Sequence, residues 1–418
     1  MIDVAIVGGG LSGLACARAL TARGITCAVF EASDAVGGRV RTDRADGYQI
    51  DRGFQVLLTA YPEAAAVLDY DALDLRAFDP GARVWLGDGF QTVGDPFRRP
   101  LQALPTLFAD VGTLLDKLKV LRLRRSVVSG PLDALWKRPE TTTKAALRER
   151  YGFSDRMIER FFRPFLGGVF LDSSLQDSSR AFEFYFRMFS TGSAAVPAAG
   201  MQAIPEQMAA ALPEGTVRLG ARVTGLAPGE IQVAGGEAVA CRAVVVATEA
   251  PGVPPLLPEV DPPPSKSTRQ LAWTADVAPT EAPVLMLDGV GTGPVNNVQV
   301  MSAVAPSYAP AGKTLVTASV LGHSDLTEDA IETAARDQLR GWFGDAVNGW
   351  RLLRSDRILH ALPDLASLDP PERPARVRDG VYVTGDWRRN ASINGALVAG
   401  RHAAEAVAAD LGALPEAA

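Results

Sequence analysis

The sequence is poor in the side chains that most often bind metals or form cross-links. Its 418 residues include three cysteines and three histidines. Cys16, Cys27 and Cys241 have neither disulfide nor zinc spacing, so we expect small, buried, apolar residues in a reducing cytoplasm. The histidines lie too far apart to form a ligand pair. The composition therefore predicts a protein without a metal site.

Excess positive charge and long apolar runs are also lacking. The formal net charge is -6, and no segment is basic enough to predict a nucleic-acid partner. No run approaches the roughly 20 apolar residues that are needed to span a bilayer. The first predicted strand begins at once, without the features of a signal peptide. We expect a cytoplasmic protein that is neither secreted nor integral to a membrane.

Glycine, in contrast, is abundant at the beginning of the chain. Residues 3–7 are almost wholly apolar and predict a buried parallel strand, and residues 11–23 predict the helix that follows. Between them, Gly8 can make a tight turn and Gly10 lets the backbone approach a pyrophosphate, while Gly13 lets the helix pack close to the strand. The amides at the N-terminus of this helix would face the phosphates. The pattern predicts a dinucleotide-binding turn.

A carboxylate and a second glycine segment follow. The predicted strand 26–30 ends at Glu31, near the position where a carboxylate hydrogen-bonds the ribose hydroxyls and repels a 2′-phosphate. NAD and FAD fit this pattern equally. Gly37 and Gly38 then permit a close backbone path along the cofactor, and Arg39 offers a permanent cation to its pyrophosphate. This second segment favours FAD.

A matching segment lies near the other end of the chain. Residues 381–384 predict a buried strand, and Asp386 at its carboxyl end can accept a hydrogen bond from a ribityl hydroxyl. Ser392 is a suitable N-cap for the next helix. If that helix N-terminus faces the flavin ring, its dipole stabilises the anion formed on hydride uptake. Two distant segments thus predict one FAD site.

At this point the chain resembles the flavin amine oxidase superfamily, and within it the phytoene desaturase group. The resemblance rests on Gly385-Asp386-Trp387, on residues 391–396, on residues 51–54, which are similar to the segment beside the flavin ring, and on residues 217–223, which are similar to a strand whose backbone contacts adenine at Val223. The chain departs from the family in having Asn394 where a glutamate is usual, which bears on the substrate and the local charge. No cysteine lies beside the C-terminal segment, so we expect FAD to be held noncovalently. The residues expected to contact FAD are Gly8, Gly10, Leu11, Ser12, Gly13, Glu31, Ala32, Gly37, Gly38, Arg39, Gly53, Phe54, Val223, Gly385, Asp386, Ser392, Ile393 and Asn394.

The split signatures require a discontinuous domain arrangement. We expect an α/β fold in which a Rossmann-type FAD-binding domain comprises residues 1–75, 200–252 and 360–418. A mixed α+β substrate domain would comprise residues 76–199 and 253–359. In that domain we expect strands at 284–287, 295–304 and 314–321 and helices at 101–125 and 327–343. The proline-rich stretch 251–264 would cross between the domains.

Aromatic residues predict where a substrate binds. Nine of the sixteen phenylalanines fall between residues 153 and 189. These rings either fill a helical core or line a large apolar cavity. The nearby glycines and the polar stretch 172–180 favour the wall of a channel, so we expect an apolar small-molecule substrate.

The helix expected at 101–125 ends in five cations. Its apolar face could pack on its own domain, with the basic end against its own C-terminal dipole. It could instead lie on an anionic membrane surface and admit a lipid substrate. We favour the first interpretation and keep peripheral membrane contact as a hypothesis.

The expected reaction is hydride transfer from an isoprenoid or carotenoid-like substrate to flavin N5. No side chain stands out as an acid or base, so the catalytic residues are left unassigned, and His360 is the histidine to test. Lys266 is similar to a lysine near N5 in amine oxidases, but we expect a solvated linker residue. Amine oxidation, for which Trp387 could supply an aromatic cage, and a redox-neutral isomerase are the alternatives.

Overall fold

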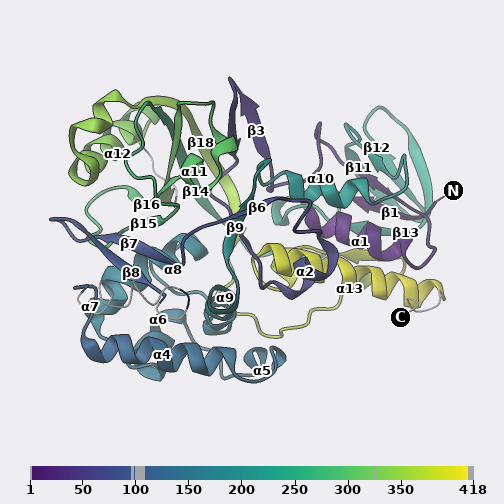
Figure 1. The fold of residues 1–418 in the computed structure, drawn as a ribbon. Helices are drawn as coiled ribbons and strands as arrows, with labels where there is room; N and C mark the ends of the chain where they lie inside the picture. Colours follow the sequence, from purple (N-terminus) through teal and green to yellow (C-terminus); the bar gives the residue numbers. More distant parts are fainter. Residues whose placement is uncertain (1, 96–97, 99–108, 323–325, 413–418) are drawn as a thin grey trace.

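The computed structural model describes residues 2–95, 98, 109–322 and 326–412. Figure 1 shows two sheet-based regions, one beside the chain termini and one around α12, with a layer of helices below the second. No helix in the described ranges is both long and apolar enough to cross a membrane. The assignment of residues to two domains stays a prediction, and its boundary at residue 360 falls inside a strand, β18.

The first sheet brings together strands from three separated parts of the chain. Its central strand, β1, pairs in parallel with β2 on one side and with β13 on the other. Parallel pairing continues from β2 to β10 and from β13 to β20, and β11, β12 and β19 add antiparallel pairs. The strands are β1 (Ile2–Val7), β2 (Cys27–Phe30), β10 (Val217–Arg218), β11 (Val223–Ala227), β12 (Glu230–Val233), β13 (Ala238–Val246), β19 (Arg376–Arg378) and β20 (Val381–Val383).

Two sequence expectations for this region need correction. The stretch 217–223 is not one strand, because Gly220 adopts a φ of +66° and turns the chain between β10 and β11. The first helix, α1 (Leu11–Thr21), ends two residues before the expected Arg23.

Helices from the two ends of the chain pack against each other on this sheet. In Figure 1, α1 in purple lies beside α13 (Ile393–Leu411) in yellow. Their backbones approach so closely that a Cβ on Gly400 would lie 2.2 Å from the Ser12 carbonyl oxygen. Small residues on the C-terminal helix therefore permit the packing that joins both signatures.

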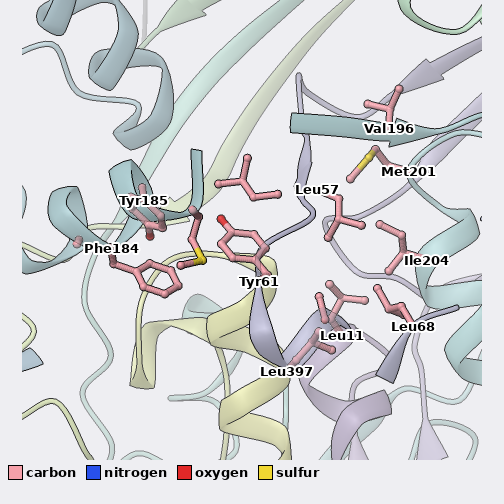
Figure 2. Packing of buried hydrophobic residues seen from close by; sticks show 14 of the residues in the cluster. Leu11, Leu57, Tyr61, Leu68, Phe184, Tyr185, Val196, Met201, Ile204 and Leu397 are labelled. Carbon is pink, nitrogen blue, oxygen red and sulfur yellow. The ribbon is translucent and has the colours of Figure 1, made fainter. Parts of the chain in front are cut away.

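The same packing extends into the main hydrophobic core. Figure 2 shows Leu11 of α1 and Leu397 of α13 in one cluster with Leu57, Leu68 and Ile204. Short elements surround this cluster. They are β3 (Thr42–Ala45), β4 (Tyr48–Asp51), β5 (Leu57–Leu58), α2 (Pro62–Val67), β6 (Leu75–Ala77), β9 (Ala194–Pro197) and α10 (Ala203–Ala210).

The second sheet is mixed and lies across the molecule from the first (Figure 1). Its order is β18 (Arg351–Pro363), β14 (Ser265–Ala275), β17 (Thr314–Leu321), β16 (Val295–Val300), β15 (Leu285–Asp288), β7 (Gly81–Trp85) and β8 (Phe90–Gly94). The strand expected at 295–304 ends at Val300, because Met301–Val304 form the helical turn α11. The helix expected at 327–343 is α12 (Glu328–Phe343), with Thr327 as its N-cap.

The third region is a layer of helices below the second sheet (Figure 1). It contains α4 (Leu114–Val128), α5 (Asp133–Trp136), α6 (Thr143–Ala145), the π-helical turns η2 (Ala146–Arg150) and η3 (Ile158–Phe162), α7 (Asp155–Met157), α8 (Arg163–Phe170) and α9 (Ser179–Thr191). The helix expected at 101–125 is therefore wrong in part. Residues 101–108 lie outside the described ranges, residues 109–113 are not helical, and the leucines at the start of α4 are exposed.

Candidate functional site

A continuous cavity of about 1710 Å³ runs from the carboxyl edge of the first sheet to the helical layer. One end is lined by both glycine segments and by the C-terminal motif, and the other by aromatic side chains of η3, α8 and α9. The sequence signatures therefore meet around one space.

Each glycine of the first turn has a different steric role. Gly8 has a φ of +112°, which favours glycine, and a Cβ on Gly13 would lie 2.0 Å from the Gly8 carbonyl oxygen. A Cβ on Gly10, in contrast, would meet no described atom within 4 Å. The backbone at Gly10 thus borders open space at the N-terminus of α1, where a pyrophosphate would fit.

The Glu31 carboxylate is held in place by the backbone of both neighbouring loops. Its Oε2 accepts a hydrogen bond from the Gly9 amide at 2.7 Å, and its Oε1 accepts one from the Ser33 amide at 2.8 Å. Glu31 also lines the cavity. This arrangement suits an acceptor for ribose hydroxyls.

Arg39 pairs with the C-terminal motif. Its Nη2 donates to Asp386 Oδ1 at 2.7 Å, and its Nη1 donates to the Ala361 carbonyl at 3.0 Å. Burial alone would lower the pKa of Arg39, but the adjacent Asp386 carboxylate raises it overall. The guanidinium is thus a fixed cation that lines the cavity.

Side-chain hydrogen bonds tie the N-terminal turn to the C-terminal helix. Ser12 Oγ lies 3.0 Å from Thr384 Oγ1 and donates to the Ala396 carbonyl at 2.9 Å. Ser392 caps α13 by accepting from the Gly395 amide at 2.9 Å. The N-terminus of α13 therefore opens toward the cavity, which Ser392 and Ile393 line.

A buried polar atom in this part of the cavity also indicates a ligand. The Thr248 hydroxyl is buried and has no hydrogen-bond partner among the described residues, although Thr248 lines the cavity beside the first glycine turn. Together with the space above Gly10 and the fixed Arg39, this unpaired hydroxyl fits a dinucleotide such as FAD.

The structure brings most of the expected cofactor residues to the cavity, but two do not line it. Gly13 packs against Gly8 and Ala247, and Asn394 is buried with its Oδ1 accepting a hydrogen bond from the Glu63 amide at 3.0 Å. Those that line it are Gly8, Gly10, Leu11, Ser12, Glu31, Ala32, Gly37, Gly38, Arg39, Gly53, Phe54, Val223, Gly385, Asp386, Ser392 and Ile393.

The phenylalanine-rich segment both lines the cavity and fills a helical core, which are the two possibilities that the sequence left open. Phe161, Phe165, Phe186 and Phe189 line the cavity. Five others fill the core behind them, namely Phe153, Phe162, Phe170, Phe182 and Phe184. The rings thus form an apolar wall that is backed by a packed aromatic layer.

Another part of the lining is polar, and the sequence analysis did not identify it. Thr268, Asn297, Ser319 and Asp356 line the cavity from four strands of the second sheet. Asn297 donates to Ser319 Oγ at 3.3 Å. In the sequence, polar residues alternate with apolar ones along these buried strands, and this alternation could have indicated a polar lining.

Lys266 is not a solvated linker residue. It lies on β14, its side chain is 10% exposed, and its Nζ bonds both oxygens of Asp177 at 2.6 and 2.7 Å. Burial raises the pKa of Asp177 to about 6, although Lys266 opposes the shift. Asp177 in the polar stretch 172–180 therefore forms an ion pair with β14, and this stretch does not line the cavity.

The remaining candidates divide between the cavity and the core. His360 lines the cavity. Trp387 is 2% exposed and does not line it, and the Arg388 guanidinium stacks on its ring at 5.0 Å. No aromatic cage at Trp387 faces the cavity.

Metal-binding side chains do not gather in the described ranges. No cluster of three or more histidine, cysteine or carboxylate side chains suited to a metal occurs there. Cys16 and Cys241 are buried, Cys27 is partly buried, and all three are free thiols.

Comparison with known proteins identifies the family. A family model described as flavin-containing amine oxidoreductase matches residues 11–408. Coproporphyrinogen III oxidase of Propionibacterium freudenreichii subsp. freudenreichii is 30% identical over 175 residues, 40% of this chain and 31% of its own length. Putrescine oxidase of Kocuria rosea is 39% identical over 85 residues, 20% of this chain and 18% of its own. The chain thus spans less than a third of each of these two relatives.

Solved structures resemble the chain over nearly its whole length. An oxidoreductase from Methanosarcina mazei superposes with a TM-score of 0.75 at 16% identity, covering 97% of this chain and 100% of its own. Putrescine oxidase with bound putrescine gives a TM-score of 0.70 at 18% identity, covering 98% and 99%. These similarities show the fold, a Rossmann-type FAD-binding architecture with a second, mixed sheet. The family match over residues 11–408 identifies the protein as an FAD-dependent oxidoreductase that belongs to the flavin-containing amine oxidoreductase family.

Proposed function

We propose that this flavoenzyme oxidises a large, mainly apolar substrate of the isoprenoid or carotenoid class. The substrate would lose a hydride and a proton from neighbouring carbons and gain a double bond. The observation that carries the proposal is the continuity of the cavity from the FAD residues to the wall of Phe161, Phe165, Phe186 and Phe189. Each methylene buried against such a wall contributes about 0.8 kcal/mol to binding.

The residues around the cavity have definable roles in this reaction. Bound FAD, held noncovalently, supplies the hydride acceptor. The capped N-terminus of α13 at Ser392 stabilises negative charge at the nearby end of the cavity. Tyr185 lines the cavity, but burial raises the pKa of its hydroxyl, which donates to the Ala391 carbonyl at 3.0 Å. It therefore remains neutral, and His360 is the candidate to accept the proton.

A second substrate class is favoured by cationic residues that line the cavity. A cyclic tetrapyrrole of the porphyrinogen type has a broad apolar ring and carboxylate arms. Such a molecule could place its ring against the phenylalanines and its arms near cationic residues that line the cavity, such as Lys117 and Arg354. The similarity to a coproporphyrinogen III oxidase supports this alternative.

Amine oxidation has less support from the geometry, although a putrescine oxidase is among the relatives. The tryptophan expected to form an aromatic cage does not line the cavity. A redox-neutral isomerase stays an alternative, because it would use the same FAD site.

Anaerobic mixing tests these proposals. The FAD-loaded protein is mixed with a polyene precursor, a porphyrinogen and a diamine, and the flavin absorbance is followed. We expect bleaching by the polyene. Bleaching by the porphyrinogen alone would move the assignment to the second class, and bleaching by the diamine alone would contradict both. Product formation without net bleaching would indicate the isomerase.

A further inference from the structure

The apolar face of the helix α4 is exposed rather than packed in the core. Leu114, Leu115, Leu118 and Leu121 are 62%, 66%, 61% and 39% exposed. At 100° per residue these four positions share one face of the helix. The buried positions Asp116, Leu123 and Val127 lie on the opposite face. The usual orientation of an amphipathic surface helix is thus reversed.

Hydrogen bonds hold the helix in this orientation. Asp116 is fully buried, and its oxygens accept from the Ser154 amide at 2.9 Å and the Ser154 hydroxyl at 2.6 Å. The same carboxylate completes a capping box with Thr113. Rotating the leucines inward would expose Val127 and break these bonds, so the exposed face is built into the fold.

Cations accompany this apolar face. Between Leu114 and Val128 the sequence has five basic residues and one acidic residue, the buried Asp116, in a chain whose net charge is -6. Arg122 and Arg125 are exposed on the same face as the leucines. An apolar stripe with adjoining cations is the pattern of a helix that lies in the interface of an anionic membrane.

The face also adjoins the mouth of the cavity. Leu114, Leu118 and Leu121 line the cavity, whereas Leu115, Arg122 and Arg125 are exposed and do not line it, so this face runs from the cavity across its rim to the outer surface. An apolar molecule dissolved in a bilayer could pass this rim without entering water. A second copy of the chain fits less well, because a two-fold contact through this face would bring Arg122 and Arg125 near their own copies.

We propose that the outward face of α4, formed by Leu114, Leu115, Leu118, Leu121, Arg122 and Arg125, docks on an anionic lipid surface. The docking places the rim of the cavity against the bilayer. This inference concerns binding alone and does not depend on which substrate is oxidised.

Vesicle flotation tests the inference with the full-length, FAD-loaded protein. We expect it to float with vesicles of phosphatidylcholine mixed with phosphatidylglycerol, and to remain in the soluble fraction with phosphatidylcholine alone. Leu115 is the residue to vary, because it is exposed and does not line the cavity. L115E should lower the partition coefficient roughly tenfold, because it removes a buried leucine from the contact. R122Q and R125Q should each lower it roughly fivefold, from the loss of about 1 kcal/mol per cation.

Val277 provides the matched control, because it is 77% exposed and lies outside both α4 and the cavity. V277E should float like the unaltered protein, and all variants should keep their FAD content and melting temperature. Wild-type protein that stays soluble with the anionic vesicles would overturn the inference. So would an equal loss of flotation in V277E and L115E. A dimer that L115E dissociates, in a protein that does not float, would assign the face to a second copy instead.

Discussion

Arg39 and Asp386 form an ion pair across 347 positions of the sequence, with 2.7 Å between Nη2 and Oδ1. The pair joins the second glycine segment to the carboxyl edge of β20, and both residues line the cavity. Neither segment alone can position its residue for a dinucleotide. The ion pair therefore couples the two sequence signatures into one site.

Removing this cation should weaken FAD binding. R39A removes the fixed cation that the cavity offers to a negatively charged pyrophosphate, and losing a hydrogen bond to a charged group costs about 2 kcal/mol, roughly a 30-fold rise in Kd. Fluorescence titration of the FAD-free protein with FAD measures the change. Arg44 is a suitable control, because it bonds the Ala199 carbonyl away from the cavity. An R44A protein that loses as much affinity as R39A would argue against the assigned role.

Two glycines of the first turn should respond differently to alanine. G10A should fold normally, because the added Cβ meets no described atom within 4 Å and the backbone φ of -74° suits any residue. It should nevertheless raise the Kd for FAD about tenfold or more, because the methyl group enters the space for the pyrophosphate. G13A should instead destabilise the fold by about 2 kcal/mol or more, since its Cβ would lie 2.0 Å from the Gly8 oxygen. Urea unfolding and FAD titration separate the two effects, and equal stability losses in both variants would contradict them.

Asp51 should make stability depend on pH. Burial raises its pKa from 3.8 to about 6, against hydrogen bonds from Thr42, Met201 and Tyr308. Between pH 4 and 6 the folded protein retains a proton that the unfolded chain loses. The free energy of unfolding therefore falls as pH rises through this window, by at most about 3 kcal/mol, and is constant above it.

The variant D51N lacks this proton and keeps the side-chain shape. Its stability relative to the unaltered protein should rise between pH 4.5 and pH 7. Urea unfolding at both pH values measures the difference. Parallel pH dependence in the two proteins would show that Asp51 does not titrate in this range.

Lys266 should matter for stability rather than for flavin chemistry. K266M leaves Asp177 buried without its cation, and breaking such a pair costs about 3 kcal/mol. The double variant K266M/D177N should recover part of the loss, because the uncompensated charge is gone. Thermal unfolding measures both variants. A K266M protein of normal stability that shows slowed flavin reduction would reverse the assignment.

The sequence predicted those elements that depend mainly on interactions between neighbouring residues. The strand at 314–321 coincides with β17, and the glycine turn and the C-terminal cap are where their sequences indicated. Long-range partners were not predictable. The prolines near Lys266 suggested a loop, whereas Lys266 lies on a strand and its side chain bonds Asp177, 89 residues away.

Periodicity also has a limit that α4 illustrates. The leucines repeat at helical spacing, which predicts that they share a face. The spacing does not say whether that face packs in the core or stays exposed, and here it stays exposed, partly toward the cavity. The polar wall of Thr268, Asn297 and Ser319 was not predictable for a similar reason. Its residues come from separate strands, and the pairing of those strands in the sheet brings them together.

The position of β1 between β2 and β13 has a consequence for biosynthesis. β2 leaves the ribosome soon after β1, but β13 follows more than two hundred residues later and β20 later still. The nascent chain must therefore carry an incomplete sheet, with an unpaired apolar edge, until the residues of β13 and β20 have been made. The coenzyme site is complete only when α13 has packed against α1, so acquisition of colour should follow the synthesis of α13.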